Sequence, residues 1–406
     1  MYSKGVCDFM KILISFAGDI STSGGMQRAC ITLANGLSAR GHTIHICYGD
    51  ISDSASFFKL NKDVKVNSFL SLSGIMSGKI GNQLSRSDKS IREILRLISR
   101  KKARAWNERC KAKIIEPGIK KVIECFKPDA ILSFGPDMSG YLFGAGVCTP
   151  IITLFRIEPR YILDVAPQAE IEAIKNSAML QIQMPFFREQ IEARCGAVPM
   201  MVIPNPVKQV LEINRGITHK NSFKIINVAR FDKKQKRQNL LLEAFALVSK
   251  DFPDWTLEFW GDVKEHSSYV DDVQNEINGL NIAEKVKICG ETQNIQEVYE
   301  SSDIFAFPSA FEGFPNALAE AMESGLPVVA WKDCPSSAVL IQDGINGFLV
   351  EDVNEAAKRL ALLMHDQTLR LHMGHSARDA MKFYSPEKTW DLWEELIHKS
   401  VKRSMG

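Results

Sequence analysis

The sequence lacks the patterns that define several common classes of protein. Its nine cysteines include no Cys-x-x-Cys pair, which argues against a zinc or dithiol redox site, and an odd, scattered set is typical of reduced thiols in a cytoplasm. No stretch approaches roughly 18 uninterrupted apolar residues, so we expect no membrane-spanning helix. We expect no signal peptide, because Asp8 and Lys11 interrupt any apolar region, and Met10 is an alternative start.

Charge and composition exclude two further classes. The 50 basic and 48 acidic residues leave a net charge of +2, which gives no basis for a nucleic-acid partner. The chain is 45% hydrophobic and 24% charged, as expected of a soluble globular enzyme. No expected strand is followed by Gly-x-Gly-x-x-Gly, which argues against a NAD-dependent dehydrogenase. At 406 residues the chain is too long for one ordinary core and suits two domains.

The N-terminal half begins with a strand-helix-strand pattern. Residues 11–17 form a short apolar run typical of a parallel strand covered on both faces, and residues 43–48 form a second strand. Between them, apolar residues recur at helical spacing over 26–39. The Gly-rich turn at 21–25 follows the first strand, at the end where doubly wound sheets bind ligands.

The alternation of strands and helices continues, stops and then restarts. Proline stiffens the backbone at 204–206, and we interpret this stretch and the polar residues 214–221 as a linker. Beyond it, sustained strand-helix alternation predicts a second parallel sheet with covering helices. We therefore expect domains over 1–206 and 207–385, with a helix at 386–406 that packs back on the first domain.

One segment differs from the rest in charge. Residues 79–121 carry 14 lysines and arginines against 4 acidic residues, an excess of ten positive charges. Four apolar residues there share one face of a helix with basic neighbours: Ile91, Ile94, Leu95 and Ile98. Either this face packs on the core of a solvated helix, or the helix rests on anionic lipid, where each basic residue contributes about 1 kcal/mol.

Residues 307–350 hold a loop, a helix start, a short apolar strand and a second Gly-rich turn. Glu312 and Glu320 lie eight positions apart on either side of the turn at 313–316. A carboxylate repels phosphate, but it accepts hydrogen bonds from the paired hydroxyls of a sugar, as acidic residues do in dinucleotide folds. Both side chains could instead be surface helix acids. The apolar strand before them and the Gly-Phe-Pro-Asn turn favour a sugar nucleotide.

A basic loop at 230–237 follows one expected strand and precedes a helix. Arg230 and Lys236 lie six positions apart in it. Two cations beside a helix N-terminus favour phosphate, since the helix dipole and the free N–H groups attract an anion and the side chains add charge-assisted bonds. A merely solvated basic loop has the same composition, so this loop alone leaves both interpretations open.

Charged residues also follow two strands of the N-terminal half. Asp137 lies after the strand at 129–134, and Arg156 and Glu158 follow the strand at 151–155. Loops at the carboxyl ends of parallel strands line the ligand-binding edge of a sheet, so these residues are candidates for the acceptor side of a site. An ordinary surface cluster of salt bridges is the alternative.

These motifs occur together in one known family. Residues 312–330, EGFPNALAEAMESGLPVVA, are similar to the E-x7-E signature of the retaining, nucleotide-sugar-dependent glycosyltransferases of family 4 (group 1). Residues 23–28 resemble that family's first glycine loop, 227–238 its pyrophosphate loop and 343–350 its closing turn. The resemblance covers roughly 11–385. It implies an α/β protein of the GT-B fold, with two Rossmann-like, doubly wound parallel-sheet domains facing each other across a cleft, the first for the acceptor and the second for the nucleotide sugar.

The resemblance also implies a role for each matched residue. Arg230 and Lys236 would hold the donor diphosphate and stabilise the charge that builds on the leaving nucleoside diphosphate. Glu312 would contact the transferred sugar, and Glu320 would hold the ribose. The other donor-side residues would approach the phosphate, support the sugar or flank the base: Gly24, Gly25, Gly290, Thr292, Gly313, Phe314, Pro315 and Asn316.

One loop departs from the commonest pattern of this family. Many relatives carry a histidine after the strand at 151–155, whereas this chain has Arg156, closer to the Glu-Arg-Asn type. The resemblance therefore implies no general base and a front-face retaining mechanism, in which the leaving phosphate takes the proton of the acceptor. No two aspartates are separated by one residue, so the metal-holding Asp-x-Asp of the other main nucleotide-sugar fold is absent. We expect no metal and no cofactor, with Arg230 and Lys236 in place of the metal.

Together these features predict a retaining glycosyltransferase. It would move a hexose or N-acetylhexosamine from a nucleotide sugar, UDP above GDP, to a glycan or a polyprenyl-diphosphate-linked acceptor in bacterial O-antigen, lipopolysaccharide or capsule synthesis. With segment 79–121 against an anionic membrane surface, it would be cytoplasmic and peripheral on the inner face of the cell membrane. Two alternatives are a non-catalytic sugar-nucleotide or glycan-binding subunit, which binds without turnover, and a nucleotide-sugar epimerase of the same fold, which needs no acceptor.

Overall fold

The computed structural model divides the chain into two compact units. It describes residues 9–22, 24–51, 58–210, 221–263 and 267–405. Unit 1 comprises Met1–Pro204 and Trp390–Gly406, and unit 2 comprises Asn205–Thr389. The chain therefore leaves unit 1 after Pro204 and returns to it at Trp390. Most of the polar stretch expected as a linker, 214–221, lies outside the described residues.

Unit 1 is built on a seven-stranded parallel sheet. Its strands lie in the order β3-β2-β1-β4-β5-β6-β7, a doubly wound order that grows in both directions from β1. The strands are β1 Lys11–Phe16, β2 Thr43–Tyr48, β3 Lys65–Ser68, β4 Ala130–Phe134, β5 Ile151–Phe155, β6 Met179–Ile182 and β7 Met200–Val202. β1, β4 and β5 are buried along almost their whole length, which explains their continuous apolar sequences.

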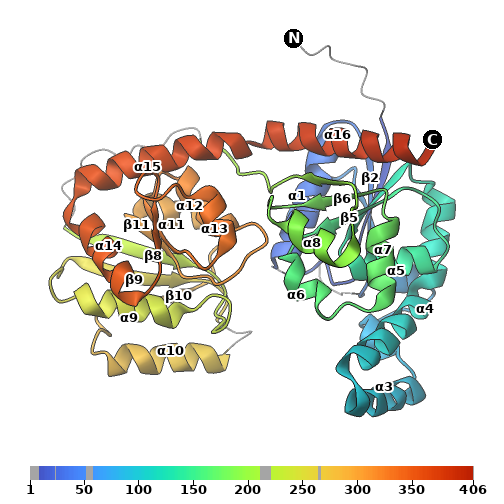
Figure 1. The fold of residues 1–406 in the computed structure, drawn as a ribbon, viewed down its shortest axis with the longest axis horizontal. Coiled ribbons are helices and arrows are strands. Elements are labelled where there is room, and N and C mark those ends of the chain that lie inside the picture. Colours follow the sequence, from blue (N-terminus) through green and yellow to red (C-terminus); the bar gives the residue numbers. More distant parts are fainter. Residues whose placement is uncertain (1–8, 23, 52–57, 211–220, 264–266, 406) are drawn as a thin grey trace, which may run out of the picture. The chain divides into compact units, whose positions relative to one another are not determined.

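Helices cover both faces of this sheet (Figure 1). On one face, α1 (Gly25–Ala39) and α16 (Pro386–Met405) share an apolar core with alternate residues of β1. On the other face, the core is formed with α2 (Phe69–Leu72), α4 (Arg100–Phe126) and α5 (Pro136–Gly144). The remaining helices of unit 1 are η1 Ile80–Gln83, α3 Arg86–Ile98, α6 Pro159–Leu163, α7 Gln168–Asn176 and α8 Phe187–Cys195.

The helix α16 contributes residues to both units. Its residues up to Thr389 belong to unit 2, and those from Trp390 onward belong to unit 1. Its buried apolar side chains in the core beside β1 are Trp393, Leu396 and Ile397. The Trp390 ring lies so close to Gly36 of α1 that a Cβ there would come within 2.5 Å of it. Arg40 Nη1 pairs with Glu394 Oε2 at 2.7 Å, so α16 is held on α1 by apolar and ionic contacts.

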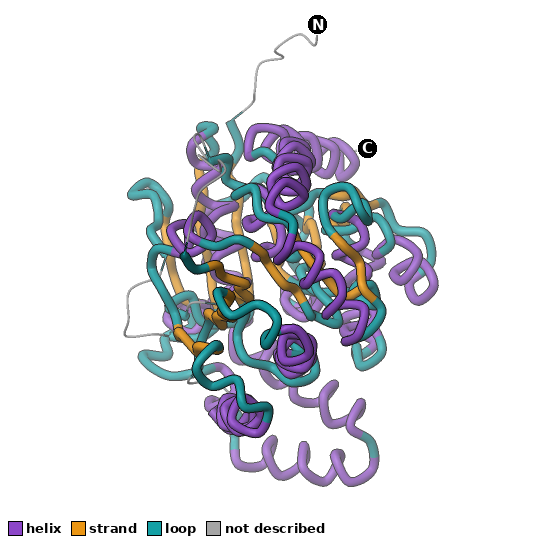
Figure 2. The backbone as a smooth tube through the Cα atoms, turned by 90° about the vertical axis from the view of Figure 1, so that its left-hand side faces the viewer, coloured by secondary structure: helices purple, strands orange, loops and turns teal. Residues whose placement is uncertain are grey.

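Unit 2 is built on a six-stranded parallel sheet in the order β10-β9-β8-β11-β12-β13, again doubly wound. The strands are β8 Phe223–Val228, β9 Trp255–Trp260, β10 Val286–Gly290, β11 Ile304–Phe307, β12 Val328–Trp331 and β13 Phe348–Val350. Figure 2 shows strands, in orange, enclosed by helices, in purple.

Helices also cover both faces of the second sheet. α9 (Gln238–Val248), α10 (Ser267–Gly279) and α14 (Val353–His365) share one apolar core on one face. On the other face α12 (Asn316–Glu323) packs with α15 (Gln367–Met381), which also contributes Met373 to the first core (Figure 1). The remaining helices are α11 Ile295–Ser301, α13 Pro335–Leu340 and η2 Lys382–Tyr384. The two doubly wound sheets confirm the predicted α/β fold class.

Candidate functional site

Three loops meet at the carboxyl ends of β8, β11 and β12. Residues 229–237 follow β8, residues 308–315 follow β11 and residues 332–334 follow β12. The three strands are consecutive neighbours in the sheet of unit 2. Because doubly wound sheets bind ligands outside the carboxyl ends of their strands, these loops form the candidate site.

Arg230 lies on the exposed side of the loop after β8. Its Nη2 pairs with Asp232 Oδ2 at 3.1 Å and donates to Gln235 Oε1 at 2.5 Å. Asp232 Oδ1 accepts hydrogen bonds from the backbone N–H groups of Lys234 and Gln235, at 3.0 and 2.8 Å. Burial opposes ionisation of Asp232, but the bond from Gln235 and the Arg230 guanidinium outweigh it and lower its pKa. The predicted basic loop is therefore folded around a carboxylate.

Lys236 and Glu312 form an ion pair between the loops after β8 and β11. Lys236 Nζ donates to Glu312 Oε1, and each side chain is only 12% exposed. The ammonium also lies 5.9 Å from the centroid of the Phe307 ring. Both residues were predicted to serve one ligand, and the fold brings them together across 76 positions of sequence. A diphosphate bound here would compete with Glu312 for the lysine.

The loop that carries Glu312 is held from two sides. Gln235 Nε2 donates to the Phe311 carbonyl at 3.0 Å. The buried Ser336 hydroxyl, on α13, donates to the carbonyls of Glu312 and Gly313 at 2.8 and 3.2 Å. Neither Gln235 nor Ser336 was predicted, because nothing in the local sequence shows which carbonyl a side chain will reach. Their bonds fix the backbone on both sides of Glu312.

The next predicted residues lead into α12. Phe314 and Pro315 are buried, and the Phe314 ring centroid lies 5.6 Å from that of Tyr384. Asn316 begins α12, and its Oδ1 accepts a hydrogen bond from Asn205 Nδ2 at 2.8 Å. Packing or a hydrogen bond therefore occupies these side chains. What the three residues can offer a ligand is their backbone groups at the helix start.

Glu320 lies on α12, one turn beyond its start. Its Oε2 accepts a hydrogen bond at 3.1 Å from the hydroxyl of Tyr299, a buried residue of α11. Tyr299 therefore orients the carboxylate that was predicted to hold a ribose. The tyrosine was not part of the prediction, since its position on a separate helix gives no sequence signal.

Gly290 and Thr292, predicted to flank a base, follow β10. Gly290 ends the strand in the left-handed region at φ +77°, and its carbonyl accepts the Gly261 N–H at 2.8 Å. Thr292 is exposed and caps the Asn294 N–H at 3.1 Å. Gly261 was not predicted, but a Cβ there would lie 2.0 Å from the Ala229 carbonyl oxygen. Only glycine permits this approach of the β9 and β8 ends.

Two glycines predicted for the phosphate lie in unit 1 at the start of α1. Gly24 is the N-cap residue and Gly25 opens the helix, and both are exposed. Gln27 Nε2 donates to the Asp19 carbonyl at 2.7 Å and so braces the turn. Ser23, the first residue of the matching motif, lies outside the described residues.

Among the charged residues after β5, Glu158 is buried and Arg160 is exposed. Glu158 is fully buried, and its Oε1 pairs with Arg160 Nε at 2.7 Å and accepts from Gln190 Nε2 at 2.9 Å. The Arg156 guanidinium lies 5.6 Å from the centroid of the Phe134 ring. Burial lowers the pKa of Arg156 to about 10, and the neighbouring Cys30 opposes this effect. The alternative of a solvated salt-bridge cluster is therefore wrong for Glu158.

Asp137 belongs to a group of three carboxylates contributed by three helices. Glu108 of α4 and Glu170 of α7 both interact with Asp137 at the start of α5. Arg104 Nη2 contacts both Glu170 oxygens at 3.1 Å, and the Tyr141 hydroxyl donates to Glu108. Burial is the main cause of the raised pKa values of Asp137 and Glu170. This group was not predicted, because its members are scattered along the sequence.

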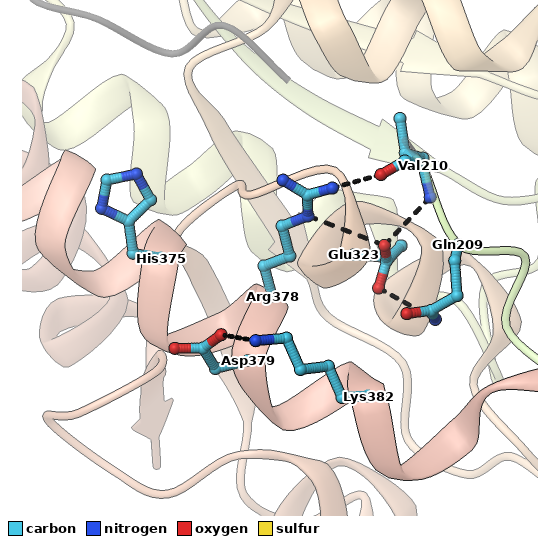
Figure 3. Close-up of a pocket in the computed structure, with 7 residues that line it drawn as sticks. All are labelled: Gln209, Val210, Glu323, His375, Arg378, Asp379 and Lys382. Atoms are coloured by element: carbon cyan, nitrogen blue, oxygen red, sulfur yellow. Dashed lines mark hydrogen bonds and ion pairs between the residues drawn. The ribbon is translucent and has the colours of Figure 1, made fainter. Parts of the chain in front are cut away.

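A separate polar pocket of about 250 Å³ lies at the C-terminal end of α12. Its lining residues are Gln209, Val210, Glu323, His375, Arg378, Asp379 and Lys382. Figure 3 shows the Arg378 guanidinium directed at the Glu323 carboxylate and the Val210 carbonyl. Glu323 is buried, which raises its pKa, and its Oε1 accepts the Val210 N–H at 3.1 Å. Hydrogen bonds and an ion pair between its lining residues connect the segment before the second sheet with α12 and α15. None of the predicted site residues lines this pocket.

Among the described residues, no helix combines the length and apolar character needed to cross a membrane. In the same part of the chain, no group of three or more His, Cys, Asp or Glu side chains could hold a metal ion.

Part of the chain is similar to known proteins. Residues 211–380 match the family described as Glycosyl transferases group 1. An uncharacterized glycosyltransferase of Haemophilus influenzae is 33% identical over 159 residues, which is 39% of this chain and 44% of that protein. A poly(ribitol-phosphate) alpha-N-acetylglucosaminyltransferase of Staphylococcus aureus is 26% identical over 195 residues, 47% of this chain and 39% of that protein. This chain thus spans less than half the length of each relative.

A solved structure extends the likeness to both units. HepE of Anabaena, in complex with UDP, aligns with a TM-score of 0.69 at 17% identity, over 96% of this chain and 100% of that one. The fold is GT-B. The segment that matches the family model lies within unit 2 and includes Lys236, Glu312 and Glu320.

Proposed function

We propose that the chain is a retaining glycosyltransferase of family 4, which moves a hexose or N-acetylhexosamine from a UDP-sugar to a glycan acceptor. The observation that carries this proposal is the Lys236–Glu312 pair at the strand ends of the segment that matches Glycosyl transferases group 1. The UDP complex of HepE supports the choice of nucleotide. The Staphylococcus aureus relative, which acts on poly(ribitol phosphate), supports a bacterial surface polymer as the product.

The pair suits the departure of a nucleoside diphosphate. The bond from C1 of the sugar to the diphosphate oxygen breaks, and a bond from C1 to the acceptor oxygen forms on the same face. Lys236 and Arg230 stabilise the negative charge on the leaving group without a metal, and a leaving phosphate oxygen takes the proton of the acceptor. As the diphosphate engages Lys236, Glu312 becomes free to accept hydrogen bonds from the sugar hydroxyls. Glu320, oriented by Tyr299, holds the ribose.

A donor screen followed by turnover tests this function. Thermal shifts with UDP-, GDP-, ADP- and CMP-sugars identify the nucleotide, because a ligand at 100 times its dissociation constant adds about 2.7 kcal/mol. With the donor identified, proton NMR of the product should show the anomeric configuration of the donor retained. Binding without turnover favours the non-catalytic subunit, and conversion of the donor without acceptor favours the epimerase. An inverted anomer contradicts the retaining mechanism.

The same proposal includes an anionic membrane surface as a partner, which places the enzyme in the cytoplasm on the inner face of the membrane. The support is α3, which together with the start of α4 extends away from the sheet of unit 1 (Figures 1 and 2). α3 has no buried residue, and of its four predicted apolar residues only Leu95 is half-buried. Ile94, Leu97 and Ile98 are 60%, 89% and 67% exposed. Apolar side chains among basic residues are the pattern of helices that lie in a lipid interface.

Co-sedimentation with vesicles tests the membrane partner. The chain should bind phosphatidylglycerol vesicles, bind phosphatidylcholine vesicles weakly, and be released by salt. Leu97→Glu should reduce binding about tenfold. Leu247→Glu, which alters an exposed leucine of α9 in unit 2, is the matched control and should bind as the wild type does. Equal binding of the two variants, or no binding of the wild type, removes the membrane from the proposal.

A further inference from the structure

Arg237 has a backbone conformation that arginine rarely adopts. It occupies the N-cap position of α9 at φ 49°, ψ 44°, in the left-handed region. Among the described residues, three that are not glycine have positive φ, and Arg237 alone of these lies in the candidate site. Such conformations are sparsely populated by side-chain-bearing residues, and they persist only where the surroundings hold them in place.

The side chain of Arg237 makes four hydrogen bonds to two other loops. Its Nη1 and Nη2 bind the two carboxylate oxygens of Asp333 at 2.5 and 2.7 Å, which is the bidentate geometry that suits a guanidinium. Its Nε donates to the Pro308 carbonyl at 2.7 Å, and Nη2 donates to the Ser309 carbonyl at 3.2 Å. Pro308 and Ser309 are buried, so their carbonyls depend on protein donors.

These bonds join the three loops of the site at one residue. Arg237 ends the loop after β8, Pro308 and Ser309 begin the loop after β11, and Asp333 lies in the loop after β12. The first loop presents Lys236, the immediate neighbour of Arg237, and the second presents Glu312. The bonds of Arg237 therefore help to hold together the loops that present the cation and the carboxylate. Gln235 ties the same two loops from the other side of Lys236.

The exposure of Asp333 indicates that its ion pair with Arg237 serves to position the loops. The Asp333 side chain is 58% exposed, and solvent screening reduces what an ion pair with an exposed partner contributes to stability. A bidentate pair nevertheless fixes direction, and a displacement of about 1 Å at a catalytic group can cost about 100-fold in rate. We propose that Arg237 is a positioning residue that sets Lys236 against Glu312 for donor binding and turnover. The inference rests on the proposed glycosyltransferase function, which it deepens.

Steady-state kinetics of a small set of variants tests this role, with the UDP-sugar identified by the donor screen. Arg237→Gln should lower kcat/KM about 100-fold, with the larger part in kcat, and Arg237→Lys should recover part of the loss. Arg237→Gly, which adopts the left-handed conformation without strain, should be as impaired as Arg237→Gln. Asp333→Asn should lower kcat/KM about tenfold, and the double variant should be no worse than Arg237→Gln, because the two act as a unit.

The matched control is Arg370→Gln. Arg370 is also an arginine of unit 2 that donates to two backbone carbonyls, at 2.5 and 3.1 Å, but it lies over Phe223 and Trp255 at the opposite ends of the strands. This variant should lower the melting temperature and leave kcat and KM unchanged.

Three results would overturn the positioning role. One is Arg237→Gln with wild-type kcat and KM, even if it melts earlier. Another is an Arg237→Gly variant with full activity, because it would show that the left-handed backbone suffices without the bonds of the guanidinium. The third is additive losses in the double variant. A wild-type chain that neither binds UDP nor consumes any nucleotide sugar is a different outcome, since it contradicts the proposed function itself before any variant is compared.

Discussion

Replacing Glu170 with glutamine tests the electrostatics inside unit 1, because it removes one charge and keeps the shape of the side chain. Glu170 is only 3% exposed. Burial is the largest influence on its pKa and raises it from an ordinary 4.5 to about 7. Arg104, which contacts both carboxylate oxygens, opposes this rise, and the neighbouring Asp137 and Glu108 add to it.

The sign of the effect follows from proton binding. Between pH 4.5 and about 7 the folded chain keeps a proton on Glu170 that the unfolded chain has released, so the free energy of unfolding falls as the pH rises. The difference between 4.5 and about 7 corresponds to roughly 3 to 4 kcal/mol, at about 1.4 kcal/mol per pH unit. Glutamine has no proton to lose. Glu170→Gln should therefore gain stability over the wild type across this window and keep the gain above it.

Urea unfolding at about pH 5 and about pH 7.5, followed by tryptophan fluorescence, measures the difference between wild type and variant. Most of this difference of roughly 3 to 4 kcal/mol should appear between these two pH values. Glu172→Gln, on the same helix, is the control: its side chain is 49% exposed, and its partner Lys175 lies 3.6 Å away. It should differ from the wild type by the same small amount at both pH values. A difference for Glu170→Gln that stays constant or shrinks as the pH rises refutes the reasoning.

Three further outcomes are expected. Glu320→Ala should raise the dissociation constant for UDP about tenfold or more in calorimetry, whereas Glu312→Ala should lower kcat more than it weakens UDP binding; the reverse pattern contradicts the two assignments. Turnover should persist in excess EDTA, and loss that magnesium or manganese restores would show that a metal is needed. Gly374→Ala should destabilise unit 2 by about 1–3 kcal/mol in urea unfolding, because a Cβ there would lie 2.1 Å from the Gly325 carbonyl oxygen; an unchanged midpoint contradicts this contact.

The central strands of both sheets could be predicted from sequence, and the edges could not. β1 is buried at all positions after Lys11, and such strands appear in the sequence as uninterrupted apolar runs. β3, Lys65–Ser68, is an edge strand in which exposed and covered residues alternate, and its four residues carry no recognisable period. Its place in the sheet is decided by pairing with β2, which only the folded structure shows.

The candidate site was predictable as a set of residues but not as a set of contacts. Family resemblance named Lys236 and Glu312, and their roles stay predictions. The lysine and the glutamate form an ion pair because two loops meet in the folded chain. The spacing of the two residues in the sequence does not show that these loops meet. Arg237 lies within the matched loop 227–238, but nothing in the sequence distinguishes it from a solvated cation beside Lys236. Its function depends on a left-handed backbone and on Asp333, which lies 96 positions away.

The division of α16 between two units has a consequence for the order in which the chain folds on the ribosome. All of unit 2 is synthesised after Pro204 and before Trp390. The core face of unit 1 beside β1 and α1 remains open until Trp393, Leu396 and Ile397 emerge. The unit that is translated first is therefore completed last, and a nascent chain carries an uncovered apolar face for as long as unit 2 takes to be made.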